Sequence, residues 1–348
     1  MASNSRRNEI FNYNDVINSN DLRKQIVNVD SRFRDSTYMS TSSNFQYTFE
    51  HPYKNVIRLR IASSEIPNSW YEFSDTNYHN TTFIVSAYDI SNNLRTVTIQ
   101  IADGNYSAID LLATIQAQFN TKLQVPYGIF MNIYPNPFSI KSTIQLSGVG
   151  PVGSTTPTQT GRPFMLNFLV PELANQPYNW GLGFNLGFKN FRYTVSTITD
   201  VSGGISTYAV QSESLINVVA EPYVFIAVND YYSVENKNMD GFTQALAKII
   251  VRDTKNAILF DDGASLLSND IVFPSPVDLK RIQVQLLDPY GNIIDLNGLN
   301  MSMSLEITEV TNTKMYEFYR NYIWLGTVPS LPSNVTGSGQ VLLGGKGP

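Results

Sequence analysis

The sequence contains no cysteine and only two histidines, His51 and His79, among its 348 residues. The missing thiols exclude a disulfide framework, a thiolate zinc site and a cysteine nucleophile, and they fit folding in a reducing compartment. Two imidazoles are too few for a histidine-rich metal centre or a two-metal hydrolase, so we expect each histidine to lie in a turn. Most common enzyme chemistries therefore lack their usual residues here.

Charge and long apolar runs are also scarce. Charged residues make up 15% of the chain and the net charge is −5, so there is no basic field to neutralise nucleic-acid phosphates. No segment reaches 18 consecutive apolar residues, and the polar N-terminus has no apolar run of signal-peptide length. We therefore expect no nucleic-acid partner, no membrane-spanning segment, no cofactor and no metal.

Alternating apolar and polar residues are the dominant pattern that is present. Residues 281–286 and 301–308 both alternate with a period of two, which is typical of antiparallel strands with one face on a core. The two segments predict a hairpin with Asp288-Pro-Tyr-Gly291 as its turn. Its solvent face would carry Gln283, Gln285, Ser302, Ser304 and Glu306.

Similar alternation elsewhere predicts an all-β fold, an antiparallel jelly-roll sandwich with one or two inserted helices and extended terminal arms. Further strands are predicted over residues 44–50, 56–66, 82–88, 95–101, 164–170, 192–197, 208–210, 223–228 and 246–251. Ser107 and Asp110 form a capping-box pattern ahead of an apolar helical stripe that ends at Phe119. We expect this helix to lie across one end of the barrel.

The composition divides the chain into three parts. Residues 1–27 are polar and predict an N-terminal arm that is ordered against a neighbour. Residues 28–312 form the jelly-roll body with its insertions. Within this body, residues 148–270 are either an insertion in one barrel or part of a second one. Residues 313–348 predict a short helix and a Gly/Ser-rich C-terminal tail.

Six segments, each a turn beside a strand, follow one another between residues 28 and 310. They are Val29-Asp-Ser-Arg-Phe-Arg-Asp35, Ser63-Ser-Glu-Ile-Pro67, Asp103-Gly-Asn-Tyr106, Leu182-Gly-Phe-Asn-Leu-Gly-Phe188, Pro276-Val-Asp-Leu-Lys280 and Asp288-Pro-Tyr-Gly-Asn-Ile-Ile-Asp-Leu-Asn297. As an ordered set they resemble the capsid proteins of large icosahedral DNA viruses, specifically the minor capsid and vertex (penton) jelly-roll proteins of the nucleocytoplasmic group.

The resemblance implies a non-enzymatic structural protein that joins capsid subunits, either at the vertex or beneath the major capsid shell. It implies no catalytic residues. The partners would be the major capsid protein, other minor capsid proteins and, at a vertex, further copies in a homo-pentamer. The location would be the virion capsid, after synthesis in the host cytoplasm.

A few side chains are candidates for subunit contacts. Arg32 and Arg34 stand in a polar segment, where an intersubunit carboxylate clamp and an intrachain salt bridge are equally compatible with the sequence. Gln283 and Gln285 face outward on the predicted hairpin, toward a neighbouring subunit or toward solvent. Trp324 is a large aromatic anchor of the kind found at interfaces.

Two other function classes stay open. A carbohydrate-binding or fibre-like attachment protein would use the Trp/Tyr pairs at Trp70, Trp180 and Trp324 to stack on sugar rings, although such residues are more often core or interface anchors. A sugar-active enzyme would need converging carboxylates, and the candidates are Glu65, Asp230 and Glu306.

The remaining polar motifs fit plain structural roles. The carboxylates of Asp261, Asp262, Asp30 and Asp35 lack the spacing of a calcium loop and are best explained as turn residues. The glycines from Gly181 to Gly187 predict tight bends around buried aromatic residues. Asn80, Asn105 and Asn334 begin glycosylation sequons in form only, since no signal peptide is encoded.

Overall fold

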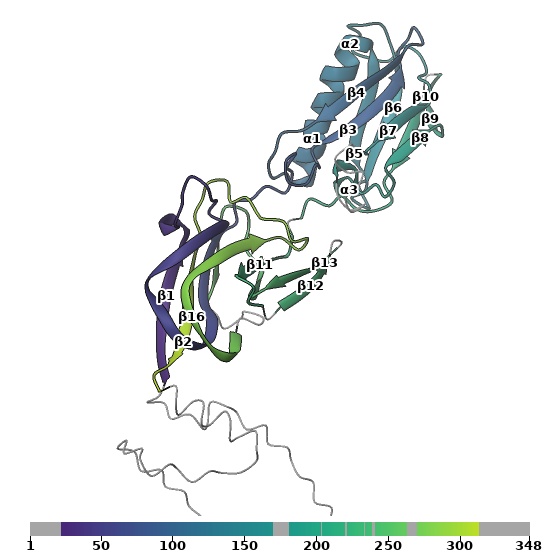
Figure 1. Ribbon diagram of the computed structural model, residues 1–348. Coiled ribbons are helices and arrows are strands. Elements are labelled where there is room, and N and C mark those ends of the chain that lie inside the picture. The colour runs from purple at the N-terminus through teal and green to yellow at the C-terminus, as the bar shows by residue number, and fades with distance from the viewer. Residues whose placement is uncertain are drawn as a thin grey trace, which may run out of the picture.

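The computed structural model of the chain describes residues 22–169, 181–202, 204–219, 221–232, 234–238, 241–262 and 270–312. They form two β bodies, one built around each of two separate hydrophobic cores (Figure 1). All strand pairs in these residues are antiparallel. The predicted all-β antiparallel sandwich class is therefore confirmed, and the described residues contain a few short helices where one or two were predicted.

The first body contains both ends of the described chain. Its main sheet has the order β1-β17-β2-β16-β11-β14, and β15 pairs with β2 beside this path. The strands are β1 (Leu22–Asp30), β2 (Asn44–Pro67), β11 (Tyr223–Val228), β14 (Ala247–Ile250), β15 (Ile258–Asp261), β16 (Asp270–Leu287) and β17 (Ser302–Val310). A two-stranded sheet of β12 (Val234–Asn238) and β13 (Gly241–Ala245) adjoins it, and the 3-10 turn η3 (Ser31–Phe33) follows β1.

Strand β2 is the centre of this sheet and joins two predicted strands, residues 44–50 and 56–66, into one. Irregular register along β17 and β16 allows the strand to curl past residues 50–56. One such shift, opposite Thr308 and Glu309, places Val56 in the main core and leaves Ile57 in a small separate cluster. The period-two pattern alone would have put Ile57 on the same face as Leu59.

The predicted hairpin between residues 281–286 and 301–308 is wrong, although both segments are strands. β16 and β17 lie on opposite sides of β2 and do not pair with each other. The turn at Asp288 does form, but it leads only to a short return, in which Ile294 N donates to Leu286 O at 3.0 Å. Alternation fixes which face of a strand is buried, and the pairing partner depends on the whole sheet.

The structure places residues 22–27, which the sequence assigned to the N-terminal arm, in β1. This strand pairs along the full length of β17, from Leu22 opposite Val310 to Asp30 opposite Ser302. The two ends of the described chain therefore lie side by side at one end of the first body (Figure 1). The predicted C-terminal helix, with Trp324 just beyond it, lies outside the described residues.

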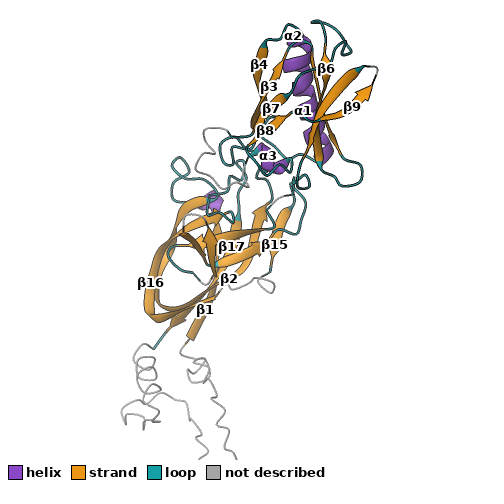
Figure 2. Cartoon of the chain, turned by 90° about the vertical axis from the view of Figure 1, so that its right-hand side faces the viewer, coloured by secondary structure: helices purple, strands orange, loops and turns teal. Residues whose placement is uncertain are grey.

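The second body spans residues 73–218 and contains two four-stranded sheets, β5-β6-β10-β9 and β4-β3-β7-β8. The strands are β3 (Thr82–Tyr88), β4 (Leu94–Gln100), β5 (Ile129–Pro135), β6 (Ser142–Val149), β7 (Phe164–Asn167), β8 (Arg192–Val195), β9 (Ile198–Ser202) and β10 (Ile205–Gln211). The described residues of this body contain three α-helices, α1 (Ala108–Phe119), α2 (Val125–Tyr127) and α3 (Leu182–Asn185), and the π-helical turn η4 (Asn120–Gln124) joins α1 to α2. Figure 2 shows α1 lying along the strands.

Helix α1 has the predicted cap, because Ser107 Oγ accepts from Asp110 N at 3.1 Å and donates to its carboxylate at 2.7 Å. It buries the predicted stripe, including Leu111 and Phe119. Its predicted place across the end of the barrel is wrong, because the helix packs against β5 and β4 of the second body. Strand β4 precedes the helix and β5 follows it in the chain, and they belong to different sheets, so the helix contacts both sheets of this body.

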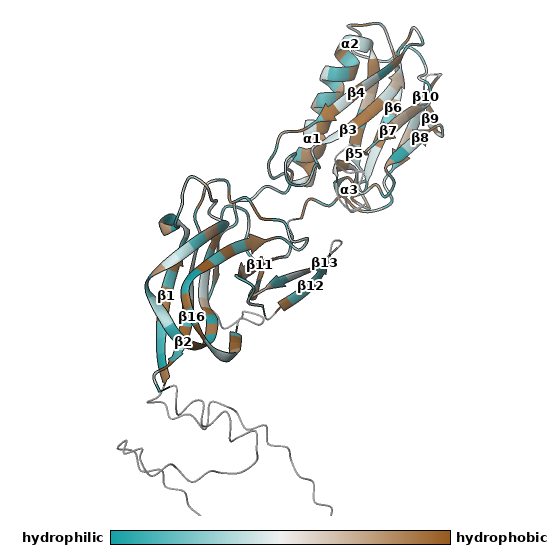
Figure 3. Cartoon of the chain, viewed as in Figure 1, coloured by the Kyte–Doolittle hydropathy of each residue, from teal (hydrophilic) through white to brown (hydrophobic). Residues whose placement is uncertain are grey.

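The middle of the chain divides between the two bodies. The insertion begins near residue 73 rather than at residue 148, and the chain returns to the first body at β11. Figure 3 shows hydrophobic and hydrophilic residues alternating along the strands of both bodies. Each body thus buries its own apolar face, and two connecting segments, residues 68–72 and 219–222, join them.

Candidate functional site: the junction between the two β bodies

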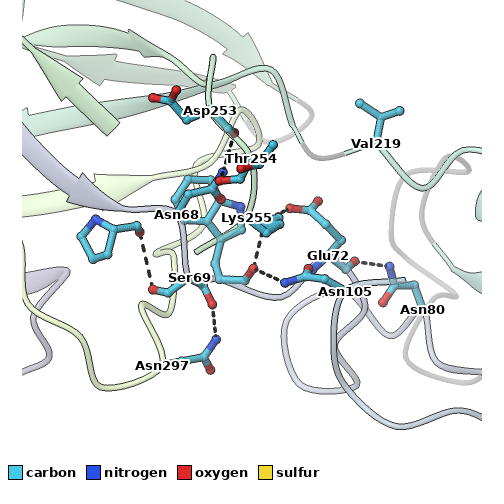
Figure 4. Close-up of polar contacts among 12 residues, drawn as sticks. Asn68, Ser69, Glu72, Asn80, Asn105, Val219, Asp253, Thr254, Lys255 and Asn297 are labelled. Atoms are coloured by element: carbon cyan, nitrogen blue, oxygen red, sulfur yellow. Dashed lines mark hydrogen bonds and ion pairs between the residues drawn. The ribbon is translucent and has the colours of Figure 1, made fainter. Parts of the chain in front are cut away.

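The outgoing connection is fixed to the first body by backbone and side-chain hydrogen bonds. Asn68 is 1% exposed; its N donates to Ala257 O at 2.8 Å, and its O accepts from Asn256 N at 2.9 Å. Its Nδ2 donates to the carbonyls of Asp253 at 3.0 Å and Thr254 at 3.3 Å (Figure 4). The first residue after β2 therefore continues into a locked segment instead of a free linker.

The next residue, Ser69, ties the same connection to the loop that follows the Asp288 turn. Ser69 Oγ donates to Leu296 O at 2.7 Å. Asn297 Nδ2 donates to Ser69 O at 2.6 Å (Figure 4). Asn297 has a positive φ of 52°, a conformation that asparagine tolerates better than most residues. Two segments more than 200 residues apart in sequence are thus joined at one point.

Lys255 holds the middle of the connection. Its Nζ donates to Trp70 O at 3.0 Å, lies 4.5 Å from the centroid of the Trp70 ring and forms a close ion pair with Glu72. The side chains of Lys255 and Glu72 are only 20% and 13% exposed. Burial lowers the pKa of Lys255, while Glu72 favours its charged form. The ammonium is therefore kept in a half-buried place by one carbonyl, one carboxylate and one aromatic ring.

On the side of the second body, Asn105 and Asn80 bind the same connection. Asn105 Oδ1 accepts from Glu72 N at 2.9 Å, and its Nδ2 donates to Trp70 O at 3.3 Å. Asn80 Nδ2 donates to Glu72 O at 2.7 Å and to Asn185 Oδ1 at 3.3 Å. Amide side chains supply both donors and acceptors, so each can satisfy a backbone that is in no strand.

Several acidic side chains lie near residues 219–222, the connection through which the chain returns to the first body. The pKa of Tyr78 is raised well above its usual value. Burial is the largest cause, and the negative charges of Asp288, Glu72 and Glu221 nearby add to it. Burial likewise raises the pKa of Glu221 and of Asp288. Asp288 still accepts from the backbone N–H groups of Tyr290 and Asn292, both at 2.8 Å. The junction therefore combines a cation, three carboxylates and a phenol in a half-buried place.

The predicted catalytic carboxylates are not brought together. Glu65 lies opposite Ser302 and accepts from its hydroxyl at 2.7 Å, whereas Glu306 lies opposite Arg60, four residues along β17. That offset corresponds to roughly 13 Å, which exceeds the spacing of paired glycosidase carboxylates. Glu306 forms ion pairs with Arg60 at 3.4 Å and Lys24 at 3.6 Å. Asp230 is an exposed residue in the turn after β11.

The predicted interface residues take up contacts within the chain. Arg32 forms an ion pair with Asp30 and donates from Nε to its carboxylate at 2.9 Å, and this hydrogen bond holds the pKa of Asp30 below its usual value. Arg34 Nη1 donates to Ser31 O at 2.7 Å. Gln283 and Gln285 are half-buried. Their Nε2 atoms lie 2.7 and 3.4 Å, respectively, from Asn44 Oδ1.

Several other candidates have structural surroundings. Trp70 is 3% exposed and packs in the first core, so it is not available for stacking on a sugar. Trp180 and Trp324 lie outside the described residues, as does the sequon residue Asn334. The amide groups of Asn80 and Asn105 bond within the chain.

The remaining acidic and histidine candidates divide between turns and strands; Asp30 ends β1 and Asp261 ends β15, so these two are not turn residues as predicted. Asp35 accepts from Thr48 N at 2.8 Å and from its hydroxyl at 2.7 Å. His79 has a positive φ of 49° in the loop before β3, as predicted. The predicted turn position of His51 is wrong, because this exposed residue lies within β2, which continues through residues 50–56 as one strand. Among the residues that the structure describes, no group of three or more histidine and acidic side chains is placed to hold a metal ion. In the same part of the chain, no helix has the length and apolar character needed to cross a membrane.

The glycine-rich segment also behaves as predicted in its described part. Gly181 and Gly187 have φ angles of 93° and 91°. A Cβ on Gly183 would lie 2.4 Å from Phe168 Cγ, so only glycine allows this close contact with the ring. Phe168 in turn stacks on Phe188 at a centroid distance of 5.0 Å.

Sequence reasoning missed the junction itself. Four of the six segments quoted for the capsid resemblance meet there: residues 63–67 lead into Asn68, residues 103–106 supply Asn105, residues 182–188 supply Asn185, and residues 288–297 supply Asn297. Their shared signal is an asparagine, which lies within three of the segments and directly after residues 63–67 in the fourth. No local pattern shows that these turns converge, because the contacts join residues up to 228 positions apart.

The fold and the junction together define a two-body antiparallel β protein with a hydrogen-bonded connection. Residues 16–226 match the family of unknown function DUF5901, and the chain belongs to this family. No curated protein matches the sequence. A solved structure described as "The 3.5 A resolution structure of the Sputnik virophage by cryo-EM" is similar at 12% identity and a TM-score of 0.36, covering 85% of this chain and 99% of that one.

Proposed function

We propose that this chain is a non-enzymatic structural protein of an icosahedral virus capsid, which joins capsid subunits at the vertex or beneath the major capsid shell. The observation that supports it most is the role of the segments that resemble capsid proteins. Two of them supply Asn105 and Asn297, whose side chains bind the connection between the bodies; a third supplies Asn185, which accepts from Asn80, and a fourth leads into the connection at Asn68. These side chains position the backbone, which is what a protein that holds neighbouring subunits at a fixed angle requires.

The form of the molecule supports the same role. Two β bodies with separate cores are joined by two connecting segments, and the polar groups of the outgoing one, residues 68–72, bond to both bodies. A body at each end of such a connection gives the protein two separate surfaces for neighbouring chains. The partners would be the major capsid protein, other minor capsid proteins or, at a vertex, further copies in a homo-pentamer.

The proposal is tested first on purified virus particles. We expect the chain in their protein inventory, at a defined copy number relative to the major capsid protein. A reconstruction should then locate both bodies in the shell, with density at the five-fold axis for a vertex subunit and beneath the capsomers for a minor capsid protein. Complete absence from the particles would refute the capsid role.

A second test uses the junction. The pair of substitutions Lys255→Met and Glu72→Gln removes the ion pair, and we expect particles with missing or displaced copies of the protein. Arg95→Met is the matched control, because Arg95 also pairs with a carboxylate, Asp89, and covers an aromatic ring, Tyr127, within the second body alone. Assembly of the protein that carries both Lys255→Met and Glu72→Gln to the same extent as the Arg95→Met control would contradict the role of the junction.

A further inference from the structure

A surface pocket of about 250 Å3 lies in the first body beside the loop that follows η3. It is lined by Asp35, Ser36, Met39, Ser40, Asn44, Phe45, Gln46 and Gln283. The pocket is smaller than the usual site for a drug-sized ligand, which measures about 300–1,000 Å3. Its size suits one or two protein side chains.

The loop of residues 31–43 is held in place by its own hydrogen bonds. Asp35 N donates to Gln46 O at 3.0 Å, and the Asp35 carboxylate accepts twice from Thr48. Farther along, Thr41 N donates to Asn44 O at 3.2 Å. A loop fixed in this way loses little conformational freedom when a partner binds.

Three large apolar side chains on this loop point into solvent. Phe33 is 70% exposed, Met39 is 92% exposed, and Tyr38 is fully exposed at 100%. Phenylalanine, tyrosine and methionine are enriched in the centres of protein interfaces. Their concentration on a loop that is otherwise well bonded indicates a surface that is covered by protein.

Two adjacent residues of the loop carry opposite charges without a counter-ion. Arg34 forms no ion pair among the described residues; Nη1 donates to Ser31 O, and Nε is buried without an acceptor. The exposed Asp35 carboxylate bonds only to Thr48 within the described chain. A carboxylate can accept about four hydrogen bonds, so acceptor positions are left on Asp35.

We propose that residues 31–43 form a two-fold contact between two copies of this chain. Arg34 of each copy pairs with Asp35 of the other, and Tyr38 and Met39 cover the pocket of the partner. A two-fold axis forms two such ion pairs and covers the pocket of each copy at the same time, because Arg34, Asp35, Tyr38 and Met39 all belong to the same loop. This contact goes beyond the proposed capsid role and does not depend on it.

Sedimentation equilibrium of the full chain over a wide concentration range tests the contact. We expect a reversible monomer–dimer equilibrium that weakens as the salt concentration rises. Arg34→Glu and the double substitution Tyr38→Ser/Met39→Ser should each raise the dimer dissociation constant by at least about tenfold. Each variant changes the contact at two places, because both copies in the dimer carry the substitution. The control is Phe138→Ser, which removes a 96% exposed aromatic side chain of the second body and should leave dimerisation unchanged.

A charge swap provides the specific readout. Arg34→Asp alone places like charges opposite each other, and adding Asp35→Arg should restore dimerisation toward the wild-type value. If the swapped protein does not fold because the Thr48 contacts are lost, the Arg34→Glu and Tyr38/Met39 results decide. A monomer at every concentration, or an assembly of any size that these loop variants leave unchanged, would overturn the proposal.

Discussion

Replacing Lys255 by methionine should weaken the junction more than the loss of an exposed ion pair would. Methionine keeps the apolar contact with Trp70 but removes the ammonium that bonds Trp70 O and Glu72. Exposed ion pairs contribute about 0–1 kcal/mol, and breaking a fully buried pair costs about 3–5 kcal/mol. With side chains 20% and 13% exposed, this pair lies between these cases. We expect a loss of about 2 kcal/mol in the free energy of unfolding.

Most of this loss should come from the Glu72 carboxylate, which would be left half-buried without its cation. Glu72→Gln in the Lys255→Met protein should therefore recover part of the stability. A double-mutant cycle should give a coupling energy of about 1 kcal/mol between the two side chains, which is within the range found for residues in contact.

Urea unfolding followed by circular dichroism measures the stability, with two transitions fitted if the bodies unfold separately. Small-angle X-ray scattering measures whether the bodies keep their relative orientation, and Lys255→Met should increase the radius of gyration. Arg95→Met should destabilise the second body alone and leave the radius unchanged. Identical unfolding midpoints and identical scattering for wild type and Lys255→Met would refute the reasoning.

Three further predictions concern pH, packing and capping. Burial raises the pKa of Glu221 in the folded protein, so the folded state binds more protons than the unfolded one just above the usual carboxyl pKa. The contribution of Glu221 to stability therefore falls as the pH rises above that usual pKa, and Glu221→Gln should gain in urea midpoint relative to wild type over the same rise. Gly183→Ala should lower the thermal midpoint of the second body, at a cost of about 1–3 kcal/mol, because the new Cβ would overlap the Phe168 ring; an unchanged midpoint would contradict the observed contact. Ser107→Ala should cost about 1 kcal/mol by removing the cap of α1, whereas Ser107→Asp should retain most of the stability in the same measurement.

Local structure was largely predictable from the sequence. Strand β3 begins and ends at the predicted residues, Thr82 and Tyr88, and the cap and buried stripe of α1 agree with the pattern. These features depend on interactions within a few residues, namely side-chain periodicity and a cap three residues from its partner. Positions at which the register shifts, such as Ile57, were not predictable, because a bulge depends on the neighbouring strand.

The sequence by itself determined that this is an antiparallel β protein without thiol chemistry, since composition and period-two alternation depend on residue types alone. Only the tertiary structure decided that β2 separates β16 from β17, that the chain forms two bodies, and that Lys255, Asn105 and Asn297 meet at the connection between them. Those contacts join segments far apart in sequence. Many pairings satisfy the same alternating pattern, and the one that forms is chosen by packing of the whole chain.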